Sequence, residues 1–427
     1  MLLAIVAAPS CRSLAYADDV LRLSTVVAEA QERNPGLAAA RERARAAATM
    51  PARASAYDDP TVSWEMWNAP NSFAVDRADN NIVRLSQRIP FPGKRTLAGT
   101  IASRDADVAA RAVDSATLDL VTMVTKAYYD LWQTHQNLDI YGRDRTLVER
   151  LARATADRYA AGGATQPDVL RAQVELTHVR TMLATEALAN ESARAELNTL
   201  LDRAPESPLG RPEDPPPPRL DADPAALTAR ALATRPEITA QRAILAREES
   251  AIRLARLDYL PDFEASAGRF INHDAPDGFG AMFSLSIPLA VKSKYDAALA
   301  EARARRTEAD AELRRLENDV RREVRQAYLR MRTAVEEHAL FADLHLPQAE
   351  QTLVATENAY AAGQIDFLSL VDSVRTIEST HVEHARAAAD FARAHADLER
   401  AVGGALRDDG TDVRPDAPSP HDPGDQR

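Results

Sequence analysis

The sequence is short of the features that mark several common classes of protein. It contains one cysteine in 427 residues, which excludes a disulfide bond within the chain. It has no run of 18 or more apolar residues, so no transmembrane helix is expected. Lysine and arginine number 52 against 64 aspartate and glutamate residues, a net charge of −12. No basic face with interleaved aromatic residues appears, so no nucleic-acid partner is expected.

The motifs that carry catalysis and metal binding are also missing. There is no nucleophile elbow, phosphate-binding loop or metal-binding helix motif, so we expect neither enzyme activity nor a cofactor. His381 and His384 lie three residues apart on one helical face, which is a possible ligand spacing. No cysteine or carboxylate cluster accompanies them, because Glu378 and Glu383 are equally well explained as solvated residues. The seven methionines are scattered, and we predict no metal site.

The two ends of the chain differ from the rest. Residues 1–17 are predicted to be a secretory signal peptide, since an apolar run is followed by the small-x-small site Ala15-Tyr16-Ala17. No basic residue precedes that run. Cys11 lies inside the predicted signal peptide, and is either lipidated or discarded with that peptide. Residues 404–427 are rich in Asp, Pro and Gly, which predicts a disordered acidic tail.

Between these ends the composition favours long helices. Aromatic residues make up 5% of the chain and glycines number 15, whereas long tracts are rich in Ala, Arg, Glu and Leu. Each half is predicted to contain a helix started by a proline, a very long helix of about 100 Å and a return helix. Pro347 is expected to kink the second long helix. The predicted helices are 35–57, 97–161 and 166–202, then 236–258, 291–362 and 366–402.

The same landmarks recur about 200 residues apart, which predicts an internal twofold repeat. Pro35 corresponds to Pro236, and the Tyr-Ala-Ala-Gly segment at 159–162 corresponds to the one at 360–363. The first repeat is assigned to 18–203 and the second to 224–403. The Pro-rich linker, 204–223, joins them. Two shorter helices stacked end to end match one long helix in length, so the linker is expected to lie in a collar at mid-height.

Each repeat also contains two segments in which apolar and polar residues alternate, the pattern of a half-buried strand. Their length suits membrane strands of about 9–11 residues. Four strands cannot close a barrel, and open edges are not tolerated in lipid, so closure requires several chains. The residues expected to face the membrane are Val62, Trp64, Met66, Val83, Leu85, Phe263, Phe283, Leu285 and Ile287.

The order of these elements, together with residues 87–95 (QRIPFPGKR), resembles the TolC-type outer membrane efflux family, and the motif is similar to its heavy-metal (CzcC/CusC-like) branch. The resemblance implies a mainly α fold with a small β part. Three chains would form a homotrimer with one 12-stranded barrel among outer-membrane lipids and a tunnel of long antiparallel helices across the periplasm. The expected partners are a periplasmic adaptor protein and an inner-membrane pump of the resistance-nodulation-division (RND) type.

In this family the turns between long and return helices dock against the adaptor. By resemblance, the docking residues here are Gly162, Gly163, Thr165, Asp168, Gly363, Gln364 and Asp366. The glycines are equally explained as helix C-caps, and the carboxylates as groups favoured in a first helical turn.

A second acidic position follows each turn in the family pattern. Asp372 keeps it after the second turn, but Ser369 replaces the first acid there, and Arg171 replaces the second acid after the first turn. Three copies of Asp372 facing a narrow pore would concentrate cations and raise one another's pKa values.

The predicted function is a passive exit channel in the outer membrane for substrate, in the first place heavy-metal cations, delivered by the pump and adaptor. Two alternatives remain open at this point. The cargo could be organic compounds, drugs or secreted protein, or the chain could be a periplasmic helical scaffold or adaptor without a barrel. The duplicated apolar strand faces favour a channel over a scaffold.

Overall fold

The computed structural model describes residues 20–67, 78–220, 222–272, 275–287 and 292–406. The predicted signal peptide 1–17 and the tail from residue 407 onward lie outside these ranges. The prediction that the disordered tail begins at residue 404 is wrong, because Leu406 packs against the main hydrophobic core. Its backbone N–H also donates to the Glu399 carboxylate at 3.0 Å.

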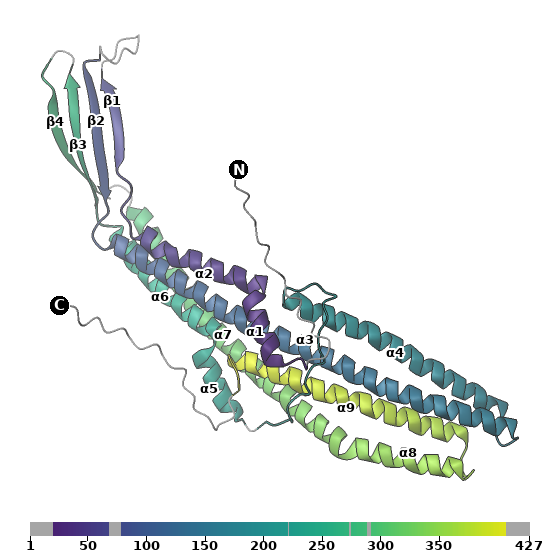
Figure 1. The fold of residues 1–427 in the computed structure, drawn as a ribbon. Coiled ribbons are helices and arrows are strands. Elements are labelled where there is room, and N and C mark those ends of the chain that lie inside the picture. The colour runs from purple at the N-terminus through teal and green to yellow at the C-terminus, as the bar shows by residue number, and fades with distance from the viewer. Residues whose placement is uncertain (1–19, 68–77, 221, 273–274, 288–291, 407–427) are drawn as a thin grey trace, which may run out of the picture.

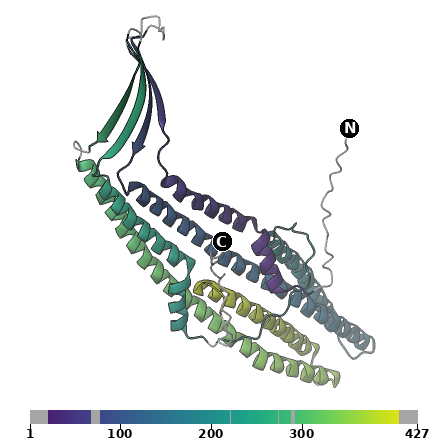
Figure 2. The ribbon, with the colours of Figure 1, turned by 60° about the vertical axis from the view of Figure 1, so that its left-hand side comes forward.

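The molecule is elongated, with a four-stranded sheet at one end and the tips of two helical hairpins at the other (Figure 1). Figure 2 shows the same separation from a second direction. The first half contains α1 (Leu23–Arg33), α2 (Pro35–Ala54), β1 (Thr61–Trp67), β2 (Asn80–Ile89), α3 (Lys94–Ala160) and α4 (Gln166–Leu200). The second contains α5 (Pro224–Thr234), α6 (Pro236–Leu257), β3 (Asp262–Asn272), β4 (Gly278–Ser286), α7 (Lys292–Leu340), the π-helical segment η2 (Phe341–His345), α8 (Leu346–Ala361) and α9 (Phe367–Val402).

The strands pair in the order β1-β2-β3-β4, all antiparallel, so residues that face each other across the ladder share one side of the sheet. Val62 lies opposite Leu85, and Leu85 lies opposite Ala267. The same register places Ala265 opposite Phe283. One face therefore carries Val62, Trp64, Met66, Val83, Leu85, Phe263, Phe283 and Leu285, with Asn81, Gln87 and Arg269 as polar exceptions.

Ile287 does not belong to this set of strand residues. It lies one residue beyond Ser286, where β4 ends, so the expectation that it is a strand residue is wrong. The next residue in the sequence is Pro288, which has no N–H to donate to a ladder and restricts the backbone of the residue before it. A period of two in hydropathy continues past the point where backbone pairing stops.

The second long helix is interrupted, as Pro347 predicts. The chain passes from α7 into η2, where the Leu346 N–H donates to the Phe341 carbonyl, and Pro347 falls in the first turn of α8. A proline cannot donate the helical hydrogen bond, and the wider π turn accommodates its ring. The chain changes direction between α7 and α8 (Figure 1).

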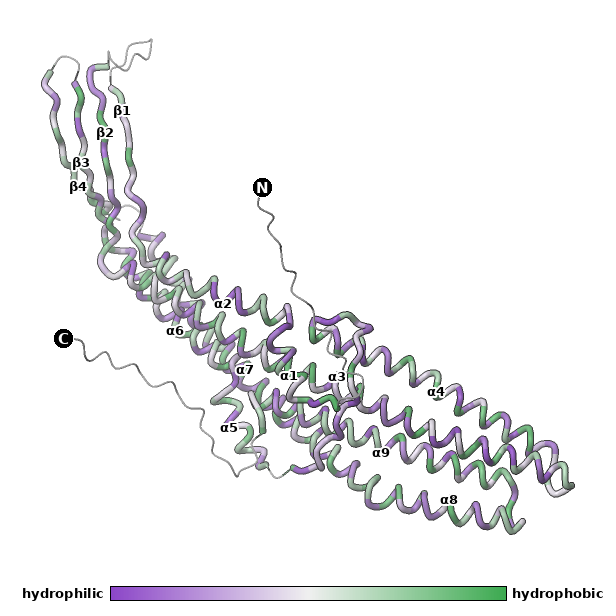
Figure 3. The backbone as a smooth tube through the Cα atoms, viewed as in Figure 1, coloured by the Kyte–Doolittle hydropathy of each residue, from purple (hydrophilic) through white to green (hydrophobic). Residues whose placement is uncertain are grey.

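None of the described helices has a segment long and apolar enough to cross a membrane. Hydrophilic and hydrophobic residues are mixed along each of them (Figure 3). The main core lies where helices from both halves meet, and includes the fully buried Tyr128, Leu131, Leu197, Met331 and Leu398. Small side chains from α9, such as Ala388 and Ala392, let the helices approach closely there.

The Pro-rich linker crosses α3 at this level. The Tyr128 hydroxyl donates to the Leu21 carbonyl at 2.6 Å and accepts the Glu213 N–H at 2.7 Å. The Trp132 indole donates to the Asp214 carboxylate at 2.9 Å. Burial raises the pKa of Tyr128, so the phenol stays protonated and keeps both bonds. The buried aromatic residues of α3 therefore attach the linker and the N-terminal segment to the long helix.

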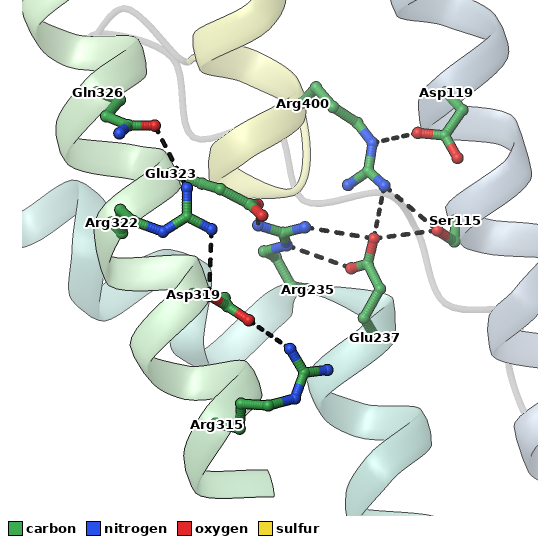
Figure 4. Close-up of polar contacts among 10 residues, drawn as sticks. All are labelled: Ser115, Asp119, Arg235, Glu237, Arg315, Asp319, Arg322, Glu323, Gln326 and Arg400. Atoms are coloured by element: carbon green, nitrogen blue, oxygen red, sulfur yellow. Dashed lines mark hydrogen bonds and ion pairs between the residues drawn. The ribbon is translucent and has the colours of Figure 1, made fainter. Parts of the chain in front are cut away.

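A buried ion network joins four helices near the same level (Figure 4). Arg235 lies between α5 and α6 and is only 5% exposed. It donates to Glu237 of α6 at 3.2 Å and to Glu323 of α7 at 2.6 Å. Arg400 of α9 donates to Glu237 and also to Asp119 of α3. Burial raises the pKa of Glu237, but hydrogen bonds from Arg235 and Arg400 outweigh it and lower that pKa to about 2.

Glu237→Gln should lower stability at neutral pH by about 2–4 kcal/mol, because it leaves Arg235 buried beside a neutral group. Since folding depresses the pKa of Glu237, this stabilisation is present above its ordinary value of 4.5 and is lost as pH falls through about 2. Thermal unfolding of wild type and variant at pH 7 and pH 2 measures both effects. Glu336→Gln, in the exposed pair with Arg332, is the control and should leave the midpoint unchanged. Equal thermal unfolding midpoints for the two variants at pH 7 would contradict the stabilising role assigned to Glu237.

Candidate functional site

The two hairpin tips, residues 161–168 and 362–369, begin with the same backbone geometry. Gly162 and Gly363 adopt φ of 79° and 72°, the left-handed conformation that favours glycine. At the first tip the N–H groups of residues 162 and 163 donate to the carbonyls of residues 159 and 158, at 3.0 and 2.7 Å. At the second, those of residues 363 and 364 donate to residues 360 and 359, at 3.0 and 2.9 Å. Both long helices therefore end in a Schellman motif.

Glycine is favoured at these positions because of the backbone conformation, and not because a larger side chain would collide with a neighbour. A Cβ atom added to Gly162 or Gly363 would meet nothing within 4 Å. Gly163 and Gln364, the residues that follow, are exposed. The tips thus present open surfaces whose shape is set by a turn that disfavours other residue types.

Each return helix begins with a carboxylate and a hydroxyl that bond to each other, in opposite order at the two tips. Asp168 accepts from the backbone N–H and the hydroxyl of Thr165, at 3.0 and 2.6 Å. Asp366 accepts from the hydroxyl and the backbone N–H of Ser369, at 2.6 and 3.0 Å. The hydrogen bonds from Ser369 lower the pKa of Asp366. Helix capping therefore accounts for the positions of Thr165, Asp168 and Asp366 without a partner.

The two tips are attached to each other. The Arg158 guanidinium lies 4.7 Å from the centre of the Tyr360 ring and donates to the Tyr360 carbonyl at 3.2 Å. Tyr360 in turn packs against Phe367, with the ring centres 5.8 Å apart. Phe367 belongs to a small buried cluster with Ala172 and Leu370. The end of α3 is therefore joined to the end of α8, and the starts of α4 and α9 share a small apolar cluster.

Asp372 lies on the exposed side of α9, one turn after the tip. Its neighbours Val371 and Val374 are buried, so the carboxylate points away from the small cluster. The backbone carbonyl of Asp372 accepts from the Thr376 hydroxyl at 2.8 Å, but its side chain makes no hydrogen bond or ion pair within the described part of the chain. Among the described residues it is an exposed carboxylate without an ion pair, although its charge acts on Arg375 of the same helix.

Sequence reasoning missed an ion pair between the two hairpins. Arg375 of α9 donates to both oxygens of Glu175 of α4, including a 2.9 Å bond from Nε to Oε2. Glu175 is only 2% exposed, whereas Arg375 reaches it from the surface. Two further buried acids, Asp144 of α3 and Glu378 of α9, lie in the same region and have no such partner. Residues this far apart in sequence offer no local signal of their proximity.

The histidines do not assemble into a metal site. His384 lies against His338 of α7, with ring centres 5.2 Å apart. Burial lowers the pKa values of His338, His381 and His384, which keeps these imidazoles neutral. Across the described ranges, no three His, Cys, Asp or Glu side chains lie close enough to hold a metal ion.

Comparison with known proteins agrees with this architecture. The chain is 23% identical over 319 residues to the cobalt-zinc-cadmium resistance protein CzcC of Cupriavidus metallidurans, which covers 74% of this chain and 75% of CzcC. The fold is similar to crystal structures of CusC (TM-score 0.77, 16% identity, 90% of this chain and 92% of that one). It is also similar to the open state of the MtrE outer membrane channel of Neisseria gonorrhoeae (TM-score 0.76, 19% identity, 90% of each chain).

The model of one family, described as outer membrane efflux protein, matches the chain twice, over residues 26–203 and again over residues 227–404. These two segments take in most of the two halves described above. The chain belongs to the outer membrane efflux protein family, and it is located in the outer membrane.

Proposed function

We propose that this chain is the exit channel of a tripartite efflux system, in which three copies enclose a passive path for substrate delivered by an adaptor and an inner-membrane pump. The observation that carries the proposal is the mainly apolar face of the sheet. Val62, Trp64 and Phe283 are 69%, 58% and 67% exposed on it. Side chains of this size exposed together on one strand face are suited to lipid.

The edges of the sheet support a homotrimer. Strands β1 and β4 each pair with one described strand and leave the other side of the ladder open. Unpaired backbone groups are costly in lipid, so each edge needs a strand from another copy. Three chains supply the twelve strands of a closed barrel. The opposite face, with Ser63, Ser86 and the 3.8 Å pair of Arg84 with Glu65, then lines the interior.

The helices supply the tunnel. With 67 residues, α3 is about 100 Å long, enough to extend far into the periplasm. The tips lie at the end opposite the sheet (Figure 1), where an adaptor joined to an RND-type pump would meet them. Both halves contain a helix, a strand pair, a long helix and a return helix in that order, which supports an internal duplication with one docking tip in each repeat.

For the cargo we propose heavy-metal cations. The support is the similarity to CzcC, a cobalt-zinc-cadmium resistance protein, and the exposed Asp372 near the tip. In a trimer three such carboxylates around a narrow mouth would attract cations. A scaffold or adaptor that stays in water has no use for an apolar sheet face, so the channel is the better account.

Leu85→Lys should prevent stable assembly in the outer membrane, because it places a charge on the apolar face in mid-strand at a cost of about 2–4 kcal/mol per copy. Ser86→Lys is the matched control, since the next residue of β2 faces the other side. Membrane fractionation and trimer bands on unboiled gels measure the outcome. Recovery of the wild-type protein as a periplasmic monomer would contradict the proposed barrel. Equal membrane recovery and equal trimer levels for the two variants would contradict it as well.

Gly162→Val or Gly363→Val should weaken adaptor docking, because a β-branched residue strains the left-handed turn by about 1–2 kcal/mol or changes its shape. Gly142→Val is the control: it lies inside α3 and an added Cβ atom there would meet nothing within 4 Å. The measurement is chemical cross-linking to the adaptor in cells, with trimer level as the reference. Normal cross-linking of both tip variants would count against docking at the tips.

Asp372→Ala should reduce the cation preference of the channel in planar bilayers, since it removes three negative charges from the mouth. A deletion strain that carries this variant should also become more sensitive to zinc, cobalt and cadmium than one carrying wild type. Glu191→Ala, an exposed acid on α4, is the control. Unchanged ion selectivity would contradict the placement of Asp372 at the channel mouth. A deletion strain that is sensitive only to drugs would contradict the proposal that the cargo is metal cations.

A further inference from the structure

Two acidic side chains are buried between the hairpins without a partner. Asp144 of α3 and Glu378 of α9 are 8% and 7% exposed. Each has one buried oxygen, Oδ2 and Oε2, with no hydrogen-bond partner among the described residues. Other buried carboxylates behave differently: Glu175 meets Arg375, and Glu248 meets Arg247. An ionised carboxylate left in such a place is costly, and the usual escape is protonation.

Arg143 acts on Asp144 and Arg375 acts on Glu378, but neither arginine forms an ion pair with its acid among the described residues. Arg375 is already bonded to Glu175, and Glu186 of α4 adds a further negative group that accepts from Asn137 at 3.1 Å. The ionisable groups whose charges act in this region are Tyr141 and Arg143 of α3, Glu175 and Glu186 of α4, and Arg375 and His381 of α9. His381 also lies near Glu350 of α8. Counting Glu350, five acids therefore lie in this region with two arginines, and one of these, Arg375, is already bonded to Glu175.

The physical consequence is that these carboxyls keep their protons to a higher pH than exposed carboxyls do. Burial, and next the charge of Glu378, raises the pKa of Asp144 to about 7, against the opposing effect of Arg143. Burial, and next the charge of Glu175, raises the pKa of Glu378. A carboxyl whose pKa is raised by packing favours the packed state at low pH, and it destabilises that state as pH rises toward the raised value.

We propose that Asp144 and Glu378 form a proton-operated joint between α3 and α9, which holds the two hairpins together while the carboxyls are protonated and loosens when they ionise. Asp144 lies about 24 Å, and Glu378 about 17 Å, from the tip ends of their helices. Loosening there would free the hairpin tips while the main core above stays packed. The proposal concerns these helices alone and does not depend on the cargo or on docking.

Hydrogen exchange of the purified full chain in detergent tests the joint. Amides in 139–150 of α3 and 373–384 of α9 are compared at pH 5.5 and pH 8.5, after correction for the intrinsic pH dependence of exchange. We expect their protection in wild type to fall at least about tenfold at the higher pH, since one pKa unit corresponds to a tenfold change. The double variant Asp144→Asn/Glu378→Gln should keep the same protection at both pH values.

The exposed acid Asp157 of α3 provides the control, and Asp157→Asn should behave as wild type does. Protection that is independent of pH in wild type, or a fall of equal size in the double variant, would overturn the proposal.

Infrared spectroscopy of unmodified protein tests the proton directly, and covers the case in which the double variant does not fold. A buried protonated carboxyl band should disappear with a midpoint near pH 7. The absence of such a band would overturn the proposal. A midpoint that shifts when magnesium or calcium is added at constant ionic strength would also overturn it, because the acids would then hold a cation in place of a proton.

Discussion

The open edges of a four-stranded sheet with one apolar face are the constraint on which the rest of the structure depends. Backbone N–H and C=O groups on β1 and β4 need partners, and large side chains such as Trp64 and Phe283 need a nonaqueous surface. Copies of the same chain around a common axis, set in lipid, meet both needs at once. In the proposed channel, the helices that leave the sheet then run side by side away from the membrane and form the tunnel.

Helices of this length need cross-connections, because their polar and apolar residues are mixed and packing alone holds them only where cores form. The structure supplies two kinds. At mid-height, Glu237 accepts hydrogen bonds from both Arg235 and Arg400, so its buried charge is compensated there. Nearer the tips, Asp144 and Glu378 are buried without partners, so that level responds to the proton. The contrast suggests a molecule that is firm in its middle and adjustable toward its adaptor end.

Sequence reasoning reached the parts of the fold that local rules control. Glycine after a long helix predicted the left-handed turns at Gly162 and Gly363, and period-two hydropathy predicted a single apolar face that the register confirms. Ile287 shows the limit, since hydropathy does not reveal where pairing stops. The contact of Glu175 with Arg375 was out of reach, because it depends on how two helical hairpins lie side by side and leaves no local pattern.

In the proposed channel, one chain is a third of a closed barrel. The most direct test is native mass spectrometry of the full-length protein extracted from outer membranes in mild detergent. Three copies in one stable complex, with lipid retained, is the predicted result. A monomer, or an assembly whose copy number does not close a barrel from four strands each, would contradict it.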